Sequence, residues 1–266
     1  MLPLICLDVD GTLVGSSGQP SEVLWAAAEG ARGRGQHLTL CTARLAAGPT
    51  RGWAERLDPE GWHIFHTGAA RWHPASGEVR ALGLGDEAVA ACAMQAEAQG
   101  WVFETYSWDD YVVDQASPLA VAHAGLLGLE LPVRPRAALE GEVVRVQFVI
   151  DAADAAAALA SAPPGTSASA ARSPVMPGAA FVSVTVAGVS KGVAIGHIAA
   201  DLGVQMGEVM MVGDGHNDLE AVQAVGWGVA VANGEPEVRS AARLVVADVD
   251  ADGAAEAIVR SASLEG

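Results

Sequence analysis

Residues 4–14 read LICLDVDGTLV, an apolar run that leads directly into two aspartates and a Gly-Thr break. Residues 4–7 are continuously apolar, which is typical of a strand buried on both faces of a parallel sheet. Because side chains at i and i+2 of a strand point the same way, the carboxylates of Asp8 and Asp10 would be neighbours where the strand ends. Carboxylates this close repel each other unless a cation lies between them or one is protonated. The stretch therefore predicts a buried strand that ends in an acidic site.

The composition excludes several classes of protein. The chain has 266 residues, of which 51% are hydrophobic, so it can build one large domain or two smaller ones. A net charge of -17 disfavours nucleic acid and anionic membrane as partners. The N-terminus lacks the basic start of a signal peptide, and no apolar stretch is long enough for a membrane span. The chain has three cysteines without metal-like spacing: Cys6, Cys41 and Cys92. They indicate buried free thiols of a reducing compartment, so we expect a cytoplasmic protein.

Strand and helix patterns alternate at both ends of the chain, which is typical of a parallel sheet covered by helices. At the N-terminal end we expect a strand over residues 4–7, a helix over 21–33 and a strand that ends near Thr42. At the C-terminal end we expect a helix over residues 189–202 that Gly203 ends, followed by strands over 207–214, 226–232 and 243–247 and helices over 217–225, 235–242 and 253–261. These patterns predict an α/β core with a Rossmann-like, doubly wound parallel sheet.

The middle of the chain follows a different pattern. A helix over residues 87–99 precedes WVFETYSWDDYVVD, residues 101–114, which reads as two strands meeting at a turn. After a Pro- and Arg-rich connection, the patterns predict a strand over residues 142–150, a helix over 151–160 and a strand over 181–188. We therefore predict an α+β domain over residues 79–186, inserted between core segments 1–78 and 187–266 at two turn-rich stretches.

Four short segments carry polar residues at positions where a sheet of this kind binds ligands. They are DVDGT at residues 8–12, CTAR at 41–44, VSKG at 189–192 and VGDGHND at 212–218. Ligands of open α/β sheets bind beyond the carboxyl ends of the strands, and Asp8, Thr42 and Asp214 each come at such an end. Lys191 begins the helix that leads into the fourth segment. We expect these residues to meet at one edge of the sheet.

The four segments, in this order, resemble the motifs of the haloacid dehalogenase superfamily of phosphotransferases. The DxDGT, threonine, lysine and GDGxND patterns match position for position. The chain has room for an inserted domain only between Thr42 and Lys191, a placement similar to that of the Cof-type sugar-phosphatase subgroup. The resemblance covers nearly the whole chain. It implies a Mg²⁺-dependent phosphatase with a cap domain, acting on a small phosphorylated metabolite such as a sugar phosphate through a phosphoaspartyl intermediate.

The residue types suit this chemistry. A carboxylate such as Asp8 can attack phosphorus and form an acyl phosphate, which divides one difficult step into two. Asp10 can protonate the leaving oxygen and then deprotonate the attacking water. Mg²⁺ prefers hard oxygen ligands, and the resemblance implies that Asp8, the backbone carbonyl of Asp10, and Asp214 hold it. We expect Thr42, Lys191 and Asn217 to bind the phosphoryl oxygens. We expect Asp218 to lie behind the metal ligands.

The core motifs contact only groups that all phosphate esters share, so substrate choice is expected to depend on other residues. We take Arg44, Trp108 and Asp109 as candidate specificity residues, the last two in the aromatic and polar turn of the 101–114 hairpin. The alternative, a turn whose aromatic residues pack on their own sheet, stays open. Thr67 stands where the subgroup usually has Asn, so any contact made by that Asn is in doubt. Ala43 replaces the commoner Gly of the second motif, and we expect this change to be mild.

Other functions and other motifs compete with this interpretation. A phosphomutase or phosphotransferase would pass the phosphoryl group to a second hydroxyl, and the sequence leaves this open. A sensor that only binds a phosphorylated ligand is disfavoured, because it has no use for a nucleophile beside an acid. The GDGHND segment has Asp218 where a dinucleotide fingerprint needs Gly, and DVDADG at residues 248–253 lacks the Glu that a calcium loop needs at position 259. Cys41 and the pair His63 and His66 are expected to be structural rather than reactive or zinc-binding.

Overall fold

The computed structural model describes residues 1–173 and 176–265. These residues form two compact units. The first comprises Met1–Ala43, Gly52–Arg80 and Ser190–Gly266, and the second comprises Arg44–Arg51 and Ala81–Val189. The domain limits after residues 78 and 186 stay a prediction. Arg44–Arg51 belongs to the second compact unit, although it lies within the predicted N-terminal core segment.

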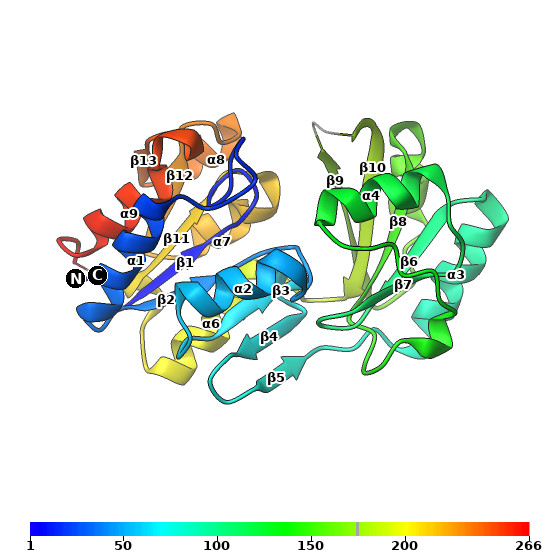
Figure 1. The fold of residues 1–266 in the computed structure, drawn as a ribbon, viewed down its shortest axis with the longest axis horizontal. Helices are drawn as coiled ribbons and strands as arrows, with labels where there is room; N and C mark the ends of the chain where they lie inside the picture. Colours follow the sequence, from blue (N-terminus) through cyan, green and yellow to red (C-terminus); the bar gives the residue numbers. More distant parts are fainter. Residues whose placement is uncertain (174–175, 266) are drawn as a thin grey trace. The chain divides into compact units, whose positions relative to one another are not determined.

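A parallel sheet of five strands forms the centre of the first unit (Figure 1). Its inner strand β1 (Leu4–Leu7) pairs in parallel with a neighbour on each side. All four residues of β1 are buried, as in a strand that is covered on both faces. The spatial order of the sheet is β13 (Leu244–Val246), β12 (Trp227–Val231), β11 (Val209–Gly213), β1 and β2 (His37–Leu40). The predicted α/β class with a parallel core sheet is therefore confirmed.

Helices cover both faces of this sheet. One face carries Leu4, Cys6 and Met211, which pack against α6 (Lys191–Leu202) and α7 (Leu219–Ala224). The other face is covered by α1 (Glu22–Gly33) and α9 (Gly253–Ser261), which also pack against each other (Figure 1). The short helix α8 (Pro236–Ala241) lies beside α7 and β12. Both faces of the sheet are thus closed, and only its edges and strand ends can hold a site.

Serine side chains cap the starts of α1 and α6, and a glycine ends α6. The side chain of Ser21 accepts a hydrogen bond from the N–H of Leu24 at 3.1 Å, so it caps the start of α1. Ser190 caps α6 in the same way, at 3.2 Å from the N–H of Val193. Gly203 has φ of 69° at the end of α6, a left-handed conformation that glycine adopts without strain. The predicted stop at Gly203 is confirmed.

Residues 48–81 contain elements that were not predicted from the sequence. They are α2 (Gly48–Leu57) and an antiparallel sheet of β3 (His63–Phe65), β4 (Ala70–His73) and β5 (Glu78–Ala81). An isolated parallel bridge from Cys41 to Ile64 places β3 beside the end of β2. This arrangement brings the turn after β3 close to the loop that carries Thr42.

The second unit is an antiparallel sheet with helices on both faces. The strand order is β7 (Tyr111–Val113), β6 (Val102–Tyr106), β8 (Arg145–Asp151), β10 (Met176–Val186) and β9 (Thr166–Ser173). One face packs on α3 (Asp86–Gln99) and α5 (Ala155–Ala160) around Phe148. On the other face, α4 (Pro118–Leu127) places the ring of His123 at 4.8 Å from the ring of Phe181. The predicted α+β insertion is confirmed.

Several details of this unit differ from the sequence-based prediction. The hairpin within residues 101–114 is present as β6 and β7. The helix expected over residues 151–160 begins instead with a 3₁₀ turn, Ala152–Asp154, before α5. The strand expected from residue 142 starts at Arg145, and α4 and β9 were not predicted. Among residues 1–173 and 176–265, every helix is too short or too polar to span a lipid bilayer.

Candidate active site

The carboxyl ends of three adjacent strands in the first unit bring the predicted site residues together. Asp8 directly follows β1, and its N–H donates to the carbonyl of Val212 in β11 at 2.9 Å. Asp214 directly follows β11, and Thr42 follows β2 after Cys41. The parallel register of these strands therefore places residues from three distant parts of the chain at one edge, as the sequence predicted.

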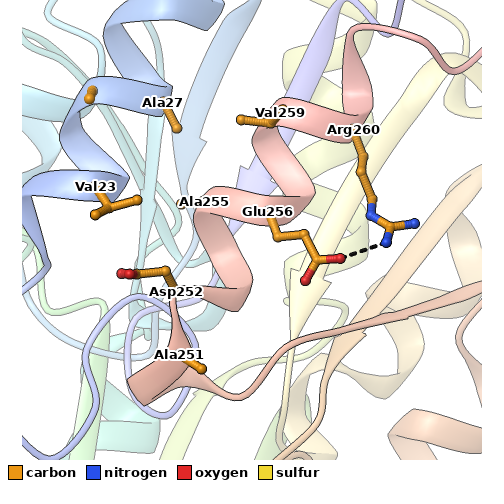
Figure 2. Close-up of a pocket in the computed structure, with 9 residues that line it drawn as sticks. Val23, Ala27, Ala251, Asp252, Ala255, Glu256, Val259 and Arg260 are labelled. Atoms are coloured by element: carbon orange, nitrogen blue, oxygen red, sulfur yellow. Dashed lines mark ion pairs between the residues drawn. The ribbon is translucent and has the colours of Figure 1, made fainter.

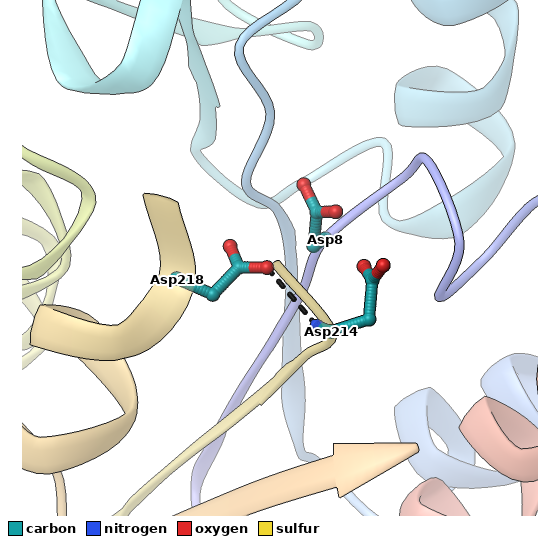
Figure 3. A group of neighbouring side chains, drawn as sticks. All are labelled: Asp8, Asp214 and Asp218. Carbon is teal, nitrogen blue, oxygen red and sulfur yellow. Dashed lines mark hydrogen bonds between the residues drawn. The ribbon is translucent and has the colours of Figure 1, made fainter. Parts of the chain in front are cut away.

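Three carboxylates form the acidic cluster at this edge. Asp8, Asp214 and Asp218 each offer one oxygen, and these oxygens all lie within 4.8 Å of one another (Figure 3). Asp8 and Asp218 are buried, and Asp214 is half-buried. Carboxylates this close in a low-dielectric site need a cation or a proton between them. We call these three residues the carboxylate cluster.

Lys191 supplies one positive charge to this cluster. Its Nζ donates to Oδ1 of Asp8 at 2.6 Å and to Oδ1 of Asp218 at 2.5 Å. The side chain is fully buried, because the first turn of α6 points it into the site. Burial opposes the charge of this ammonium group, but the carboxylates of Asp218 and Asp8 outweigh burial and raise the pKa of Lys191 above its ordinary value. Lys191 is therefore a permanently charged group at the centre of the site.

The single ammonium group does not balance the carboxylates. Burial, followed by the charge of Asp218, raises the pKa of Asp8 well above its ordinary value, although Lys191 opposes the rise. Burial and Asp218 also raise the pKa of Asp214 to about 6, although a hydrogen bond from Thr12 lowers it. Burial and the neighbouring carboxylate thus both disfavour the ionised forms of Asp8 and Asp214, and Lys191 compensates for them only in part. Mg²⁺ prefers hard oxygen ligands and would add positive charge beside these carboxylates, so Asp8 and Asp214 fit the metal that the sequence predicts.

Both carboxylate oxygens of Asp218 accept hydrogen bonds from other residues of the chain. Its Oδ1 accepts from Lys191, and its Oδ2 accepts from the backbone N–H groups of Asp214 and Gly215, both at 3.1 Å. A Cβ at Gly213 would lie 2.6 Å from the Cβ of Asp218, so the glycine is needed for this close turn. The partners of Asp218 leave Asp8 and Asp214 as the carboxylates available to a metal. Its role behind the metal ligands stays a prediction.

The turn after Asp8 depends on a glycine. Gly11 has φ of +79°, and a Cβ there would lie 2.3 Å from Oδ2 of Asp214. Thr12 then donates from its hydroxyl to Oδ1 of Asp214 at 3.0 Å. Asp10 lies on the exposed side of this turn and is not one of the clustered carboxylates. Its proposed acid and base role is compatible with that exposure, because the group must exchange protons with water.

The remaining motif residues lie around the cluster. Thr42 is buried, and its backbone is held on both sides, because its N–H donates to Ile64 at 2.9 Å and its carbonyl accepts from Thr67 at 3.0 Å. Asn217 is exposed and directly precedes the buried Asp218. The phosphate-binding roles of Thr42, Lys191 and Asn217 stay predictions.

The departure at Thr67 has a backbone consequence. His66 and Thr67 have φ of 51° and 58°, so two consecutive non-glycine residues adopt left-handed conformations. Asn tolerates this conformation better than most residues, whereas a β-branched residue is strained in it. The structure thus gives a conformational reason for an Asn at this position. The strained turn supports the site, because the N–H of Thr67 holds the carbonyl of Thr42.

The candidate specificity residues belong to the second unit. The N–H of Ala46 donates to the carbonyl of Trp108 at 3.0 Å, so the segment that contains Arg44 packs on the 107–110 turn. The guanidinium of Arg51 lies 5.5 Å from the Trp108 ring and 3.7 Å from the Asp109 carboxylate. Arg51, the next basic residue after Arg44, is not among the candidate residues that the sequence indicates. Trp108 and Asp109 remain partly exposed, and their role in specificity stays a prediction.

Other side chains of this turn are structural. Tyr106 and Tyr111 stack with ring centroids 5.2 Å apart, and the Tyr106 hydroxyl donates to the buried Glu104 carboxylate at 2.5 Å. Asp110 is held by Arg134 at 2.8 Å. For these three residues, the alternative of packing within the unit describes what the structure shows.

The motifs that the sequence reading set aside also have structural partners. His63 accepts from the N–H of Leu40 at 3.0 Å and contacts the carbonyl of Asp58 at 2.8 Å, and burial lowers its pKa to about 4. Burial raises the pKa of the Cys41 thiol well above its ordinary value, which suits an unreactive thiol. Asp250 accepts from the N–H of Ser16 at 2.8 Å.

A groove of about 730 Å³ lies between α1 and α9, and it is not the reactive site (Figure 2). Small apolar side chains dominate its lining, and its charged pair, Glu256 and Arg260, is closed by an ion pair of 2.7 Å. It shares no lining residue with the carboxylate cluster. The chemistry therefore points to the strand ends rather than to this groove.

Comparison with known proteins agrees with this geometry. A family model described as haloacid dehalogenase-like hydrolase matches residues 146–258. The chain is 28% identical over 265 residues to the putative phosphatase YxeH of Bacillus subtilis, a match that covers 97% of each chain. A phosphoglycolate phosphatase of Methanothermobacter thermautotrophicus is 39% identical over 79 residues, which are 30% of this chain and 36% of that protein.

Solved structures share the whole fold. A haloacid dehalogenase-like hydrolase from Bacteroides thetaiotaomicron superposes with a TM-score of 0.86 at 24% identity, over 98% of this chain and 99% of that one. A sugar phosphatase of the haloacid dehalogenase subclass IIB superposes with a TM-score of 0.82 at 25% identity, also over 98% and 99%. The first of these shows the shared fold, and the second is a sugar phosphatase of similar fold.

Proposed function

The chain belongs to the haloacid dehalogenase-like hydrolases and is a phosphatase of that family, and we propose that it hydrolyses a small phosphorylated metabolite, in particular a sugar phosphate. The observation that carries the proposal is the carboxylate cluster with Lys191 at its centre. A buried ammonium group beside an aspartate at a strand end offers a phosphoryl group both a nucleophile and a counter-charge.

In the proposed reaction, Asp8 and Asp10 act in two successive steps. A carboxylate oxygen of Asp8 attacks phosphorus, and the bond from phosphorus to the leaving oxygen breaks as the aspartyl phosphate forms. Asp10 gives its proton to the leaving oxygen, and it then takes a proton from the water that attacks the aspartyl phosphate. Phosphate leaves, and both carboxylates return to their starting state. Phosphate monoesters are very slow to hydrolyse unaided, so division into two steps is a large advantage.

Mg²⁺ would be held by Asp8, by the backbone carbonyl of Asp10 and by Asp214. When bound, it supplies the positive charge that lets an anionic nucleophile approach an anionic ester. Lys191, Thr42 and Asn217 bind the phosphoryl oxygens in this proposal, Lys191 as a charge and the others as hydrogen-bond donors. Asp218 keeps Lys191 and the Asp214 loop in place through the contacts described above.

A sugar phosphate is supported by the subclass IIB sugar phosphatase of the same fold and by the side chains of the 107–110 turn. Trp108, Asp109 and Arg44 combine an aromatic ring with hydrogen-bonding groups, which suits a polyhydroxylated leaving group. The three cysteines form no disulfide and are buried, which is typical of a reducing compartment, so the proposed location is the cytoplasm.

The test is a phosphate-release screen over many phosphorylated metabolites with Mg²⁺ present, with Asp8→Asn as the inactive control. We expect release from one or more sugar phosphates and none from the control. Trp108→Ala and Asp109→Ala should change the order of preference among sugar phosphates while changing acetyl phosphate hydrolysis much less. Formation of an isomeric phosphate without phosphate release would show a phosphomutase instead. A uniform loss on all substrates would assign the turn to structure.

A further inference from the structure

The loop after β12, residues 232–235, contacts both acidic loops of the site. The side-chain amide of Asn233 donates from Nδ2 to the carbonyl of Gly11 at 2.7 Å. In the same loop, the backbone N–H of Glu235 donates to the carbonyl of Asp214 at 2.8 Å. The Oδ1 of Asn233 accepts from the N–H of Val249 at 2.8 Å. One exposed side chain thus joins the turn after Asp8 to a third segment of the first unit.

Gly11 is the point at which the turn after Asp8 needs a tether. Its φ of +79° and its closeness to Asp214 leave no room for a side chain. Glycine restrains its own backbone less than any other residue, so the turn must be held from outside. The N–H of Gly11 donates to the carbonyl of Val14 at 3.0 Å. Because the peptide unit is planar, that bond orients the carbonyl of Asp10, which lies in the same plane.

The bond from Asn233 holds the next peptide plane, which carries the carbonyl of Gly11 and the N–H of Thr12. Together the two bonds restrain both sides of Gly11. They therefore restrain the Asp10 carbonyl on one side and, on the other, Thr12, which donates to Asp214.

We propose that Asn233 is a positioning residue for the Mg²⁺ site. Its amide fixes the carbonyl of Gly11, and through it the separation between the Asp8–Asp10 turn and Asp214. It acts through the backbone and touches neither the phosphoryl group nor the metal. The inference rests on the proposed function, since it gives Asn233 a purpose in a Mg²⁺-dependent phosphatase. Partners that orient metal ligands typically change metal affinity or activity by about 10–100-fold when removed.

The test uses two variants at this position and one matched control. Asn233→Ala removes the donor and the acceptor together. Asn233→Asp keeps an acceptor for Val249 but replaces the donor to Gly11 with an oxygen. The control is Gln36→Ala, because the Nε2 of Gln36 also donates to a backbone carbonyl, that of Leu2, at 2.7 Å. Leu2 precedes β1, at the end of that strand away from Asp8.

The dissociation constant of Mg²⁺ is measured by calorimetric titration at pH 7.5, and kcat and KM are measured with acetyl phosphate. We expect both Asn233 variants to weaken Mg²⁺ binding roughly tenfold and to lower kcat, with little change in melting temperature. Asn233→Asp separates the two explanations best, because its extra negative charge alone would strengthen Mg²⁺ binding, whereas loss of the hydrogen bond to Gly11 is expected to weaken it. Gln36→Ala should lower the melting temperature and leave the Mg²⁺ dissociation constant within about twofold of the wild-type value.

The inference is overturned if both Asn233 variants bind Mg²⁺ as the wild type does, or if Gln36→Ala weakens binding equally. Absence of Mg²⁺ binding by the wild type would overturn it as well, because no site would remain to be positioned. If the wild type binds Mg²⁺ but releases phosphate from no ester, the proposed function fails. The comparison of dissociation constants would still decide the role of Asn233.

Discussion

Replacing Lys191 with Met should destabilise the metal-free protein severely at neutral pH. Methionine keeps most of the length and the apolar stem of lysine but removes the charge. In the wild type, Nζ of Lys191 lies 2.6 Å from Asp8 and 2.5 Å from Asp218, and all three side chains are buried. Without the ammonium group, two buried carboxylates face each other with no compensating cation.

The magnitude follows from the burial. Removing one partner of a buried ion pair costs about 3–5 kcal/mol of the free energy of unfolding. A protein of this size loses roughly 2–4 °C in melting temperature per kcal/mol, so the expected drop is about 6–20 °C. The drop should shrink as the pH falls. The pKa of Asp8 is already raised in the folded wild type, and a protonated Asp8 no longer repels Asp218.

The assay is thermal denaturation in a chelator, followed by circular dichroism, at pH 7.5 and pH 5. The matched control is Arg260→Met, which removes an exposed pair at 2.7 Å from Glu256, with the two side chains 52% and 33% exposed. Exposed pairs of this kind contribute about 0.3–0.5 kcal/mol, so the control should melt within about 2 °C of the wild type. If Lys191→Met loses no more stability than the control, the electrostatic reasoning about the site is wrong.

Three further results are expected. Asp8→Asn should lower phosphate release by at least about 10³-fold while its circular dichroism spectrum stays unchanged, because an amide is not a nucleophile of this kind; substantial release by a folded variant would contradict the assignment. Thr67→Asn should raise the free energy of unfolding by about 1 kcal/mol in urea titrations, because φ of 58° strains a β-branched residue; equal or lower stability would show that the turn is not strained. The rise in melting temperature on adding Mg²⁺ should be larger at pH 7.5 than at pH 5. The pKa of Asp214 is raised to about 6, so protonation stabilises the metal-free fold below about pH 4, and this stabilisation is lost as the pH rises through about 6. Below pH 6, protons also compete with Mg²⁺ for this carboxylate. An equal rise in melting temperature at both pH values would contradict this reasoning.

The core of the first unit could be predicted because its sequence signals are local and mutually consistent. A continuous apolar strand followed by Asp8, and another followed by Asp214, specify both the sheet and the edge at which the acids meet. The clustering of Asp218 with Lys191 needed the structure, since it depends on how α6 approaches the loop after β11. Sequence spacing alone placed Asp218 only on the same side as Asp214.

The missed elements had weaker or less usual signals. Helix α2 buries Thr50, Trp53, Ala54 and Leu57 at helical spacing, so its signal was present but lay in a polar segment. Helix α4 is apolar all round and has almost no periodicity, and only its caps mark it: Ser117 before Pro118 and Gly128 after Leu127. Asn233 could not be found from sequence, because its partners lie near residues 11 and 249 and meet it only in the fold.

The pairing of β1 with β11 has a consequence for how the chain folds. Thr12 and Asp214 are separated by 202 positions in the sequence, yet they share a hydrogen bond in the site. The second unit, by contrast, is built almost entirely from the continuous stretch Ala81–Val189. Its contacts are more local, so it can form while β1 still lacks one of its two neighbours. During synthesis the second unit is therefore expected to fold first, and the N–H of Asp8 acquires its partner, the carbonyl of Val212, only once β11 has left the ribosome.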